Sequence, residues 1–259
     1  MIRVDVYLVS EGYAKSRQSA QQSIEAQLVT IDGRCVKKPS EKIDETLPHV
    51  VDYASTIAYV GRGGLKLEAA LDRFEIDPTG AVCFDVGAST GGFTDCLLKR
   101  GALRVYAIDS GRDQLAKELR DDARVVSLEG MNARFLDYDS VGSYADIIVM
   151  DVSFISQTLI IPRFPLLLND GGRVITLIKP QFECGRDALG KGGIVKKPEH
   201  RLFAVRRVTE SARECGLHLH GLIRSPIEGG DGNVEFLAYF KKDINSLPSE
   251  TILGGVDYK

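Results

Sequence analysis

A short apolar strand that runs directly into a glycine-rich turn constrains the fold of this chain more than any other feature. The segment 82–94 reads VCFDVGASTGGFT. Its apolar start favours a buried strand, while Gly87, Gly91 and Gly92 allow unusual backbone angles and the close approach of a ligand. In an open α/β sheet a ligand binds at the carboxyl end of the first strand. We therefore expect such a sheet, with a binding site at this turn.

The turn matches neither of two common phosphate-binding patterns. The Gly-x-Gly-x-x-Gly spacing of dinucleotide sites is absent, and Phe93 stands where a P-loop requires lysine. Instead, Asp85 precedes the glycines, and a carboxylate there would repel a pyrophosphate but suits a cation or an amino group. S-adenosylmethionine (SAM) carries both a sulfonium and an ammonium. Taken alone, the turn is equally consistent with an ordinary strand–helix junction.

A second acidic strand end narrows the choice of ligand. Residues 103–108 predict another strand, and Asp109 follows it, about 20 residues after the glycine turn. A carboxylate at this place can accept hydrogen bonds from both hydroxyls of a ribose. An adenosine-containing ligand without a phosphate is therefore favoured, which again indicates SAM.

The rest of the chain alternates between predicted strands and helices. This rhythm indicates an α/β fold, a Rossmann-like sheet that is mostly parallel. The glycine-rich link 228–233 should let the last two strands pair antiparallel, which leaves one reversed strand at 234–240. Further strands are predicted at 124–128, 145–150, 173–178 and 217–224, and helices at 65–74, 92–100, 112–120, 156–168 and 199–215.

Residues 1–43 predict a separate small α+β unit. Two helices are expected at 4–11 and 17–27, and the Asp32-Gly33 pair between apolar runs predicts a hairpin over 28–36. Basic side chains outnumber acidic ones among its polar positions. This excess is typical of an ordinary solvated face and would also suit an anionic partner.

The domain organisation follows from a composition change at 55–64. We assign residues 1–60 to the first domain and its linker, 61–243 to the second domain, and 244–259 to a C-terminal tail that the composition suggests is frayed. No apolar run has the length of a membrane span or a signal peptide. The five scattered cysteines are typical of reduced thiols in a cytoplasmic protein, and no metal site is expected.

Four ionisable residues should converge at one edge of the predicted sheet. Asp151 and Lys179 follow two parallel strands, and Glu235 lies at the start of the reversed strand, which begins at the edge where the parallel strands end. Lys66, at the start of the helix before the first strand, can reach the same edge. Each residue alone has a structural explanation, but their joint placement indicates an active site.

The segment that follows Asp151 bears on the methyl acceptor. It reads DVSF rather than the Asn/Asp-Pro-Pro-Tyr/Phe of many amino-group methyltransferases, and the chain has no cysteine after a proline, as carbon-5 pyrimidine enzymes commonly have. With amino groups and carbon 5 of pyrimidines set aside, a ribose 2′-hydroxyl is a methyl acceptor that fits the sequence. A lysine whose pKa is lowered by burial and a neighbouring cation can act as its base. Our hypothesis assigns this role to Lys179, with Lys66, Asp151 and Glu235 as orienting residues.

The chain resembles known families over nearly all of residues 1–243. The Lys-Asp-Lys-Glu order is similar to the tetrad of the FtsJ-like ribose 2′-O-methyltransferases. The N-terminal positions Arg3, Asp5, Gly12, Arg17 and Gly33 resemble the S4 RNA-binding domain. Together they resemble the TlyA (haemolysin A) family of rRNA methyltransferases, through the motifs YVGRGGLKL at 59–67, DVGASTGGFT at 85–94, DVSFI at 151–155, KPQFE at 179–183 and GDGNVEF at 230–236.

This resemblance implies a SAM-dependent enzyme that methylates cytidine ribose in the rRNA of ribosomal subunits, with no protein partner evident. Two alternatives remain: a membrane-active haemolysin, and a non-catalytic RNA-binding assembly factor. The net charge of −3 means that local basic patches must bind the RNA. By resemblance, further SAM contacts are Ser89, Gly91, Phe93, Met131 and Asn132, and the RNA contacts are Arg3, Lys15, Arg17, Arg34, Lys37 and Arg62. Lys191 and Lys196 belong to a basic loop beside the expected active site, which is equally consistent with phosphate binding and with an ordinary solvated loop.

Overall fold

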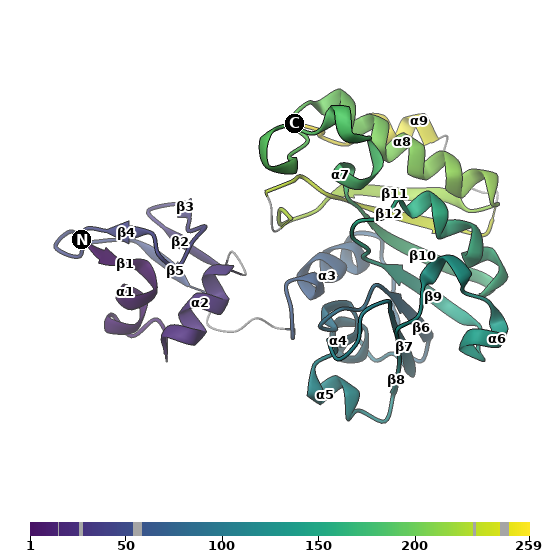
Figure 1. Cartoon of the computed structure of the whole chain (residues 1–259), viewed down its shortest axis with the longest axis horizontal. Helices are drawn as coiled ribbons and strands as arrows, with labels where there is room; N and C mark the ends of the chain where they lie inside the picture. Colours follow the sequence, from purple (N-terminus) through teal and green to yellow (C-terminus); the bar gives the residue numbers. More distant parts are fainter. Residues whose placement is uncertain (15, 26–27, 54–58, 230–231, 244–248) are drawn as a thin grey trace. The chain divides into compact units, whose positions relative to one another are not determined.

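The computed structural model describes residues 1–14, 16–25, 28–53, 59–229, 232–243 and 249–259. The chain divides into two compact units, Met1–Arg62 and Gly63–Lys259. Figure 1 labels the helices and strands of both units.

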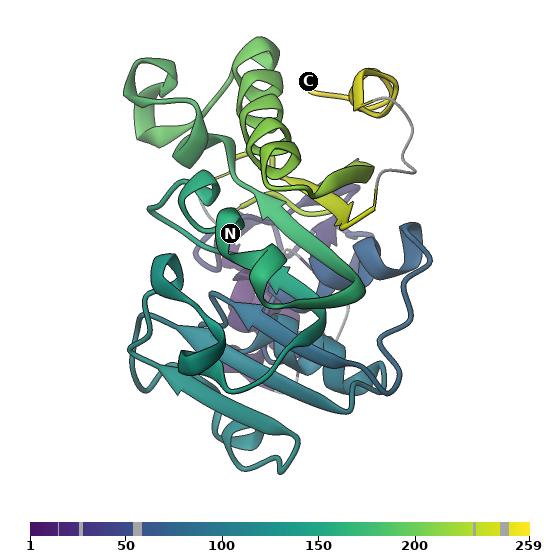
Figure 2. The ribbon, with the colours of Figure 1, turned by 90° about the vertical axis from the view of Figure 1, so that its right-hand side faces the viewer.

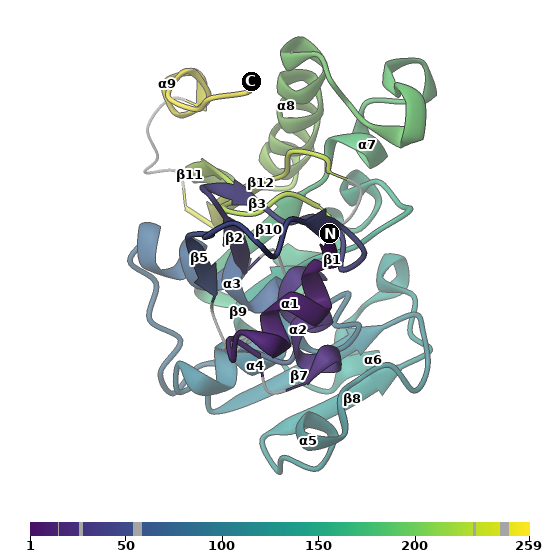
Figure 3. The ribbon, with the colours of Figure 1, turned by 90° about the vertical axis from the view of Figure 1, so that its left-hand side faces the viewer.

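The first unit packs two helices against short strands (Figure 3). Val4, Leu8, Ala20 and Ile24 are fully buried in its core, which explains the apolar spacing of both helices. The predicted hairpin is present, with Asp32 and Gly33 both at positive φ. The elements are β1 (Ile2–Arg3), α1 (Val4–Ser10), α2 (Arg17–Glu25), β2 (Val29–Ile31), β3 (Arg34–Cys35), β4 (Lys42–Ile43) and β5 (Val51–Tyr53).

The second unit is built on a seven-stranded sheet in the order β11-β12-β10-β9-β6-β7-β8. β12 runs opposite to the other described strands of this sheet and pairs antiparallel with both β10 and β11, so the predicted mostly parallel sheet with one reversed strand is confirmed. The strands are β6 (Val82–Val86), β7 (Arg104–Asp109), β8 (Val125–Glu129), β9 (Ala145–Met150), β10 (Leu168–Ile178), β11 (His218–Arg224) and β12 (Phe236–Lys241).

Helices pack against this sheet and form the hydrophobic core of the second unit with it. The largest core cluster joins sheet residues such as Phe84 and Ile148 to Val205 and Val208 of the long helix α8. Figure 2 shows α8 beside the C-terminal part of the sheet. The helices are α3 (Gly63–Arg73), α4 (Gly92–Lys99), α5 (Lys117–Arg120), α6 (Tyr138–Val141), α7 (Pro180–Glu183), α8 (Pro198–Glu214) and α9 (Ser249–Gly254).

The helix predicted at 156–168 is wrong. The segment forms two 3-10 helices, η2 (Gln157–Leu159) and η3 (Ile161–Leu166), with Pro165 inside the second. A proline lacks the N–H that an α-helix needs and clashes with the preceding turn, so the segment cannot run as one α-helix.

The helix predicted at 112–120 is also too long. Only α5 is helical, because the Glu129 carboxylate accepts the backbone N–H groups of Asp113, Gln114 and Leu115. These groups are therefore held by a side chain from the end of β8 instead of entering a helical ladder.

The C-terminal segment is not frayed where the structure describes it. Residues 249–254 form α9, where Leu253 is buried, and the Tyr258 carbonyl accepts a hydrogen bond from Arg201 at 2.9 Å. Within the described ranges, none of the helices combines the length and the apolar character needed to cross a bilayer.

Candidate active site

The glycine turn brings two strand ends together. Gly87 has a φ of +87°, and a Cβ atom there would lie 2.5 Å from the Asp151 backbone oxygen. The Asp151 N–H donates to the Val86 carbonyl at 3.0 Å, so the ends of β6 and β9 meet at Gly87. Gly91 has a different role, because a Cβ there would lie 2.2 Å from Leu119 of α5. Glycine is needed at both positions for close packing.

A cavity of about 860 Å³ opens at this edge of the sheet. It has the size of a small-molecule site. Of the residues that the sequence indicated for SAM, the cavity is lined by Gly87, Ser89, Asp109, Met131 and Asn132. Asp85, Gly91 and Phe93 are not among its lining residues; Phe93 is buried against Gly63 at the start of α3.

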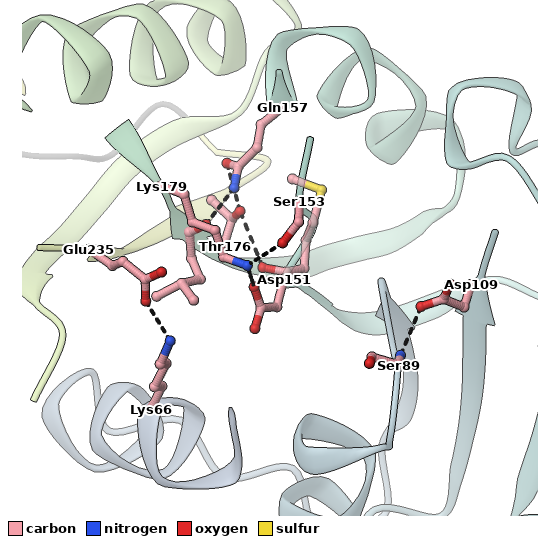
Figure 4. Close-up of polar contacts among 11 residues, drawn as sticks. Lys66, Ser89, Asp109, Asp151, Ser153, Gln157, Thr176, Lys179 and Glu235 are labelled. Carbon is pink, nitrogen blue, oxygen red and sulfur yellow. Dashed lines mark hydrogen bonds and ion pairs between the residues drawn. The ribbon is translucent and has the colours of Figure 1, made fainter. Parts of the chain in front are cut away.

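Asp109 is fixed at the cavity wall by backbone donors. Its Oδ2 accepts from the Ser89 N–H at 2.8 Å (Figure 4). Its Oδ1 accepts from the Gly111 N–H at 2.7 Å. A carboxylate has about four lone-pair sites, so both oxygens can still accept hydroxyl groups of a ligand. Glu129, bonded to three consecutive N–H groups, holds the neighbouring segment, and those bonds lower its pKa.

Asp85 is fully buried behind the turn. Its Oδ2 accepts from the Thr94 hydroxyl at 2.6 Å, while its Oδ1 has no hydrogen-bond partner among the described residues. The pKa of Asp85 is raised to about 7, chiefly by burial and in smaller part by the nearby carboxylates of Asp151 and Asp109, against the hydrogen bond from Thr94. A buried carboxylate oxygen without a partner suits a cationic ligand group, so these residues fit SAM.

The structure brings the four predicted catalytic side chains to one place as two ion pairs (Figure 4). Lys66 of α3 contacts Glu235 just before β12, and both side chains are buried. The Lys179 Nζ lies 2.6 Å from the Asp151 Oδ1 and donates to the Ser153 hydroxyl at 2.9 Å. The second pair is partly exposed at the cavity, which Asp151 and Ser153 line.

The two pairs also influence one another. Burial raises the pKa of Glu235, the positive charges of Lys66 and Lys179 oppose this rise, and Asp151 adds to it. Two lysines and two carboxylates thus form one balanced cluster. Such a cluster can hold a hydroxyl group and exchange its proton beside the cavity.

Sequence reasoning missed Phe154, which stands at the mouth of the cavity. The residue has a positive φ of 63°, and its side chain is 91% exposed. Its ring centroid lies 5.1 Å from that of Phe182. An exposed aromatic residue with a left-handed backbone is unusual and indicates a constrained position. No local sequence signal identifies it, because glycine and asparagine are the usual left-handed residues.

The basic residues predicted to contact RNA differ in their exposure and in their hydrogen-bond partners. Arg3 and Arg17 each donate to the fully buried Asp5, and these bonds, that from Arg3 above all, hold the pKa of Asp5 far below its usual range. Their side chains remain about half exposed. Arg34, Lys37, Lys191 and Lys196 are exposed, Arg62 is partly buried, and Lys15 lies outside the described residues.

Two family comparisons match most of the chain. The FtsJ-like methyltransferase family matches residues 59–242, and the S4 domain matches residues 2–46. The four residues of the ion-pair cluster all lie within the first match.

Individual relatives agree with these matches. The 16S/23S rRNA (cytidine-2′-O)-methyltransferase TlyA of Mycobacterium tuberculosis is 43% identical over 92% of this chain and 89% of its own length. Hemolysin A of Brachyspira hyodysenteriae is 43% identical over 92% of this chain and 99% of its own. A solved structure from Streptococcus thermophilus, provisionally named a hemolysin, is 40% identical, covers 98% of this chain and 94% of its own, and superposes with a TM-score of 0.74.

Proposed function

Because this chain belongs to the TlyA/haemolysin A family, in which an S4 domain precedes an FtsJ-like methyltransferase domain, we propose that it methylates the 2′-hydroxyl of a cytidine in ribosomal RNA. The single observation that carries this proposal is the Lys66–Glu235 and Lys179–Asp151 cluster beside a cavity of the right size for SAM. The substrate is the rRNA of ribosomal subunits, and the reaction takes place in the cytoplasm.

The cavity residues divide the binding of SAM between them. SAM supplies an electrophilic methyl group. Asp109 accepts the ribose hydroxyls, and Met131 and Asn132 flank the adenine. Asp85 does not line the cavity, but the free Oδ1 of this buried carboxylate attracts the ammonium group from behind the glycine turn. Gly87 and Ser89 complete the wall beside the glycine turn, while Gly91 and Phe93 shape that turn from behind.

The cluster acts on the 2′-hydroxyl. Lys179 is the base: its Nζ receives the hydroxyl proton while the oxygen takes the methyl group from the sulfonium sulfur. Asp151 and Ser153 hold this Nζ in place, and the buried Lys66–Glu235 pair fixes the surrounding charge. Most of the rate enhancement comes from the fixed positions of these groups and from the exclusion of water.

RNA is held at both units of the chain. Arg3, Lys15, Arg17, Arg34 and Lys37 bind phosphates through the S4 domain, Arg62 binds them at the start of the FtsJ-like match, and Lys191 and Lys196 bind them beside the catalytic cluster. Phe154 offers an exposed ring at the cavity mouth on which an unstacked base can lie. This places the sugar of the same nucleotide towards the cluster.

The test is methyl transfer from labelled SAM to purified ribosomal subunits that lack the modification, followed by mapping of ribose-methylated positions. We expect incorporation at a cytidine 2′-hydroxyl, and loss of incorporation in Lys179→Ala with SAM binding retained. SAM binding without incorporation by the unmodified protein would favour the non-catalytic assembly factor. Leakage from lipid vesicles, with no methyl transfer, would favour the membrane-active haemolysin.

A further inference from the structure

Glu183 is a buried carboxylate whose hydrogen bonds reach across to another loop. The residue is 1% exposed. One carboxylate oxygen accepts from the Ser156 hydroxyl at 2.6 Å and the other from the Gln157 backbone N–H at 2.7 Å. Its own backbone carbonyl accepts from Arg207 of α8 at 2.6 Å. A buried carboxylate is costly unless its oxygens are bonded, so this site is built to hold residues 156–157.

The two segments that Glu183 joins both carry residues of the active site. Glu183 ends α7, which follows directly on Lys179 and contains Phe182. Ser156 and Gln157 follow the segment 151–155. We call the hydrogen bonds of Glu183 to Ser156 and Gln157 the joint. The buried side-chain amide of Gln157 extends it, because this amide donates to the Leu177 carbonyl at 2.6 Å and accepts from the Thr176 hydroxyl at 2.8 Å (Figure 4). Hydrogen bonds therefore tie the segment after β9 to β10 and to the segment that follows it.

Phe154 lies between two anchors of this joint. On one side Ser153 accepts from Lys179, and on the other Ser156 and Gln157 are held by Glu183. A phenylalanine with φ of 63° and a side chain that is 91% exposed gains little from its own burial. Such a conformation persists only where the surroundings over-determine it.

We propose that Glu183 is a positioning residue that holds the segment 153–156 so that the Phe154 ring stands over the cavity mouth and stacks on the base of the target nucleotide. The inference rests on the proposed function, since it assigns the occupant of that mouth. Glu183 itself contacts neither SAM nor RNA. Its loss should therefore weaken the capture of RNA and leave SAM binding unchanged.

The experiment compares Glu183→Ala with Glu183→Gln in the full-length protein. Glutamine can accept from the Gln157 N–H and donate to the Ser156 hydroxyl, so it keeps the joint, whereas alanine removes it. For Glu183→Ala we expect the KM for ribosomal subunits to rise about tenfold, as for loss of one base–aromatic stack, with the SAM dissociation constant unchanged. Glu183→Gln should restore the KM to within about threefold of the unmodified value.

A double-variant cycle with Phe154→Ala tests whether the effect passes through the ring. We expect Glu183→Ala to add nothing to the loss in Phe154→Ala, because residues that act as one unit are not additive. Additive losses, or an unchanged KM in Glu183→Ala, would overturn the inference. Ser156→Ala, which removes one of the two donors, supplies a milder variant if Glu183→Ala does not fold.

Chymotrypsin cleavage after Phe154 tests the joint independently of activity. Glu183→Ala should be cut faster than the unmodified protein, and Glu183→Gln should resist equally well. Equal resistance of all three proteins would show that Glu183 does not hold the segment. An unmodified protein that methylates no subunit would instead contradict the proposed function, so the two failures are distinguishable.

Discussion

Lys66 and Glu235 form a buried ion pair although they are 169 positions apart in the sequence. Lys66 belongs to α3, which precedes the first strand of the sheet, and Glu235 comes directly before its last strand, β12. Each buried charge depends on the other for compensation, and the pair joins the beginning of the second unit to the end of its sheet.

Removal of one member of this pair should cost more stability than removal of both. We expect Lys66→Met to destabilise the protein by about 3 kcal/mol at pH 8, because Glu235 is left buried and alone, and by less at pH 5, where it can be protonated. The double variant Lys66→Met/Glu235→Leu should recover most of this loss. Urea unfolding at both pH values measures the difference, and both variants should be inactive in methyl transfer. Equal stability of all three proteins would show that the pair is not desolvated.

Phe154→Asn should make the protein more stable and less active. Asparagine tolerates the left-handed backbone that strains phenylalanine, so the free energy of unfolding should rise by about 0.5–1 kcal/mol. Loss of the ring should lower methyl transfer to subunits by about tenfold. Phe154→Ala is the matched control, because it also lacks the ring but, unlike asparagine, has no polar side chain that can hydrogen-bond locally and ease the left-handed backbone. Thermal unfolding that ranks both variants below the unmodified protein would contradict the strain argument.

Asp85 should make stability depend on pH. Its carboxyl pKa of about 7 in the folded chain lies above the unfolded value of about 3.9, so the folded state binds the extra proton between these values. The free energy of unfolding should therefore fall as the pH rises from about 4 to about 7. Asp85→Asn should not show this fall, which urea titrations across the pH range would measure.

The protonation of Asp85 can also be tested through SAM binding. An ammonium beside Asp85 stabilises its charged form, so binding should release a proton near pH 7. Calorimetry in two buffers of different ionisation enthalpy measures this release, and Asp85→Asn should abolish it. A release that persists in the variant would assign the proton to another group.

His49 should titrate above its ordinary range. Its Nδ1 lies 2.8 Å from the Asp32 carboxylate and its Nε2 lies 2.9 Å from the Asp44 carbonyl, and since both oxygens only accept, both nitrogens must donate. These bonds, chiefly that to Asp32, raise the pKa of His49. The stability they contribute is present below about pH 6.5 and is lost as the pH rises through the folded pKa.

Histidine NMR signals of the full chain report this titration directly. The Val50 N–H, which donates to Asp32 at 2.9 Å, supplies a local measure through its protection from hydrogen exchange. Protection should decrease above the midpoint, and His49→Gln should remove the pH dependence. A His49 midpoint at or below about 6.5 would contradict the doubly donating ring.

The parts of the site that follow from strand ends could be predicted from the sequence. Asp109, Asp151 and Lys179 come directly after or at the end of apolar strands, and the carboxyl ends of parallel strands share an edge. Glu235 could be predicted at the same edge because the glycine-rich link before it indicated a reversed strand. Periodicity and strand polarity were sufficient for these positions.

Features set by distant side chains could not be predicted. The hydrogen bond between Gln157 and Glu183 spans 26 positions, and nothing in either segment indicates the other. The shortened α5 depends on the reach of Glu129 back to residue 113. By contrast, the prolines within 157–166 are visible in the sequence, and they are a sufficient reason to expect no long α-helix there.

The place of β12 has a consequence for biosynthesis. This last strand is inserted between β10 and β11, both of which precede it in the chain. A nascent polypeptide therefore holds a divided sheet, with Lys66, Asp151 and Lys179 already made, until residues 235–241 leave the ribosome. Only a chain that already includes residue 235 has all four groups of the cluster that we propose to be catalytic, so a shorter nascent copy cannot form the Lys66–Glu235 pair.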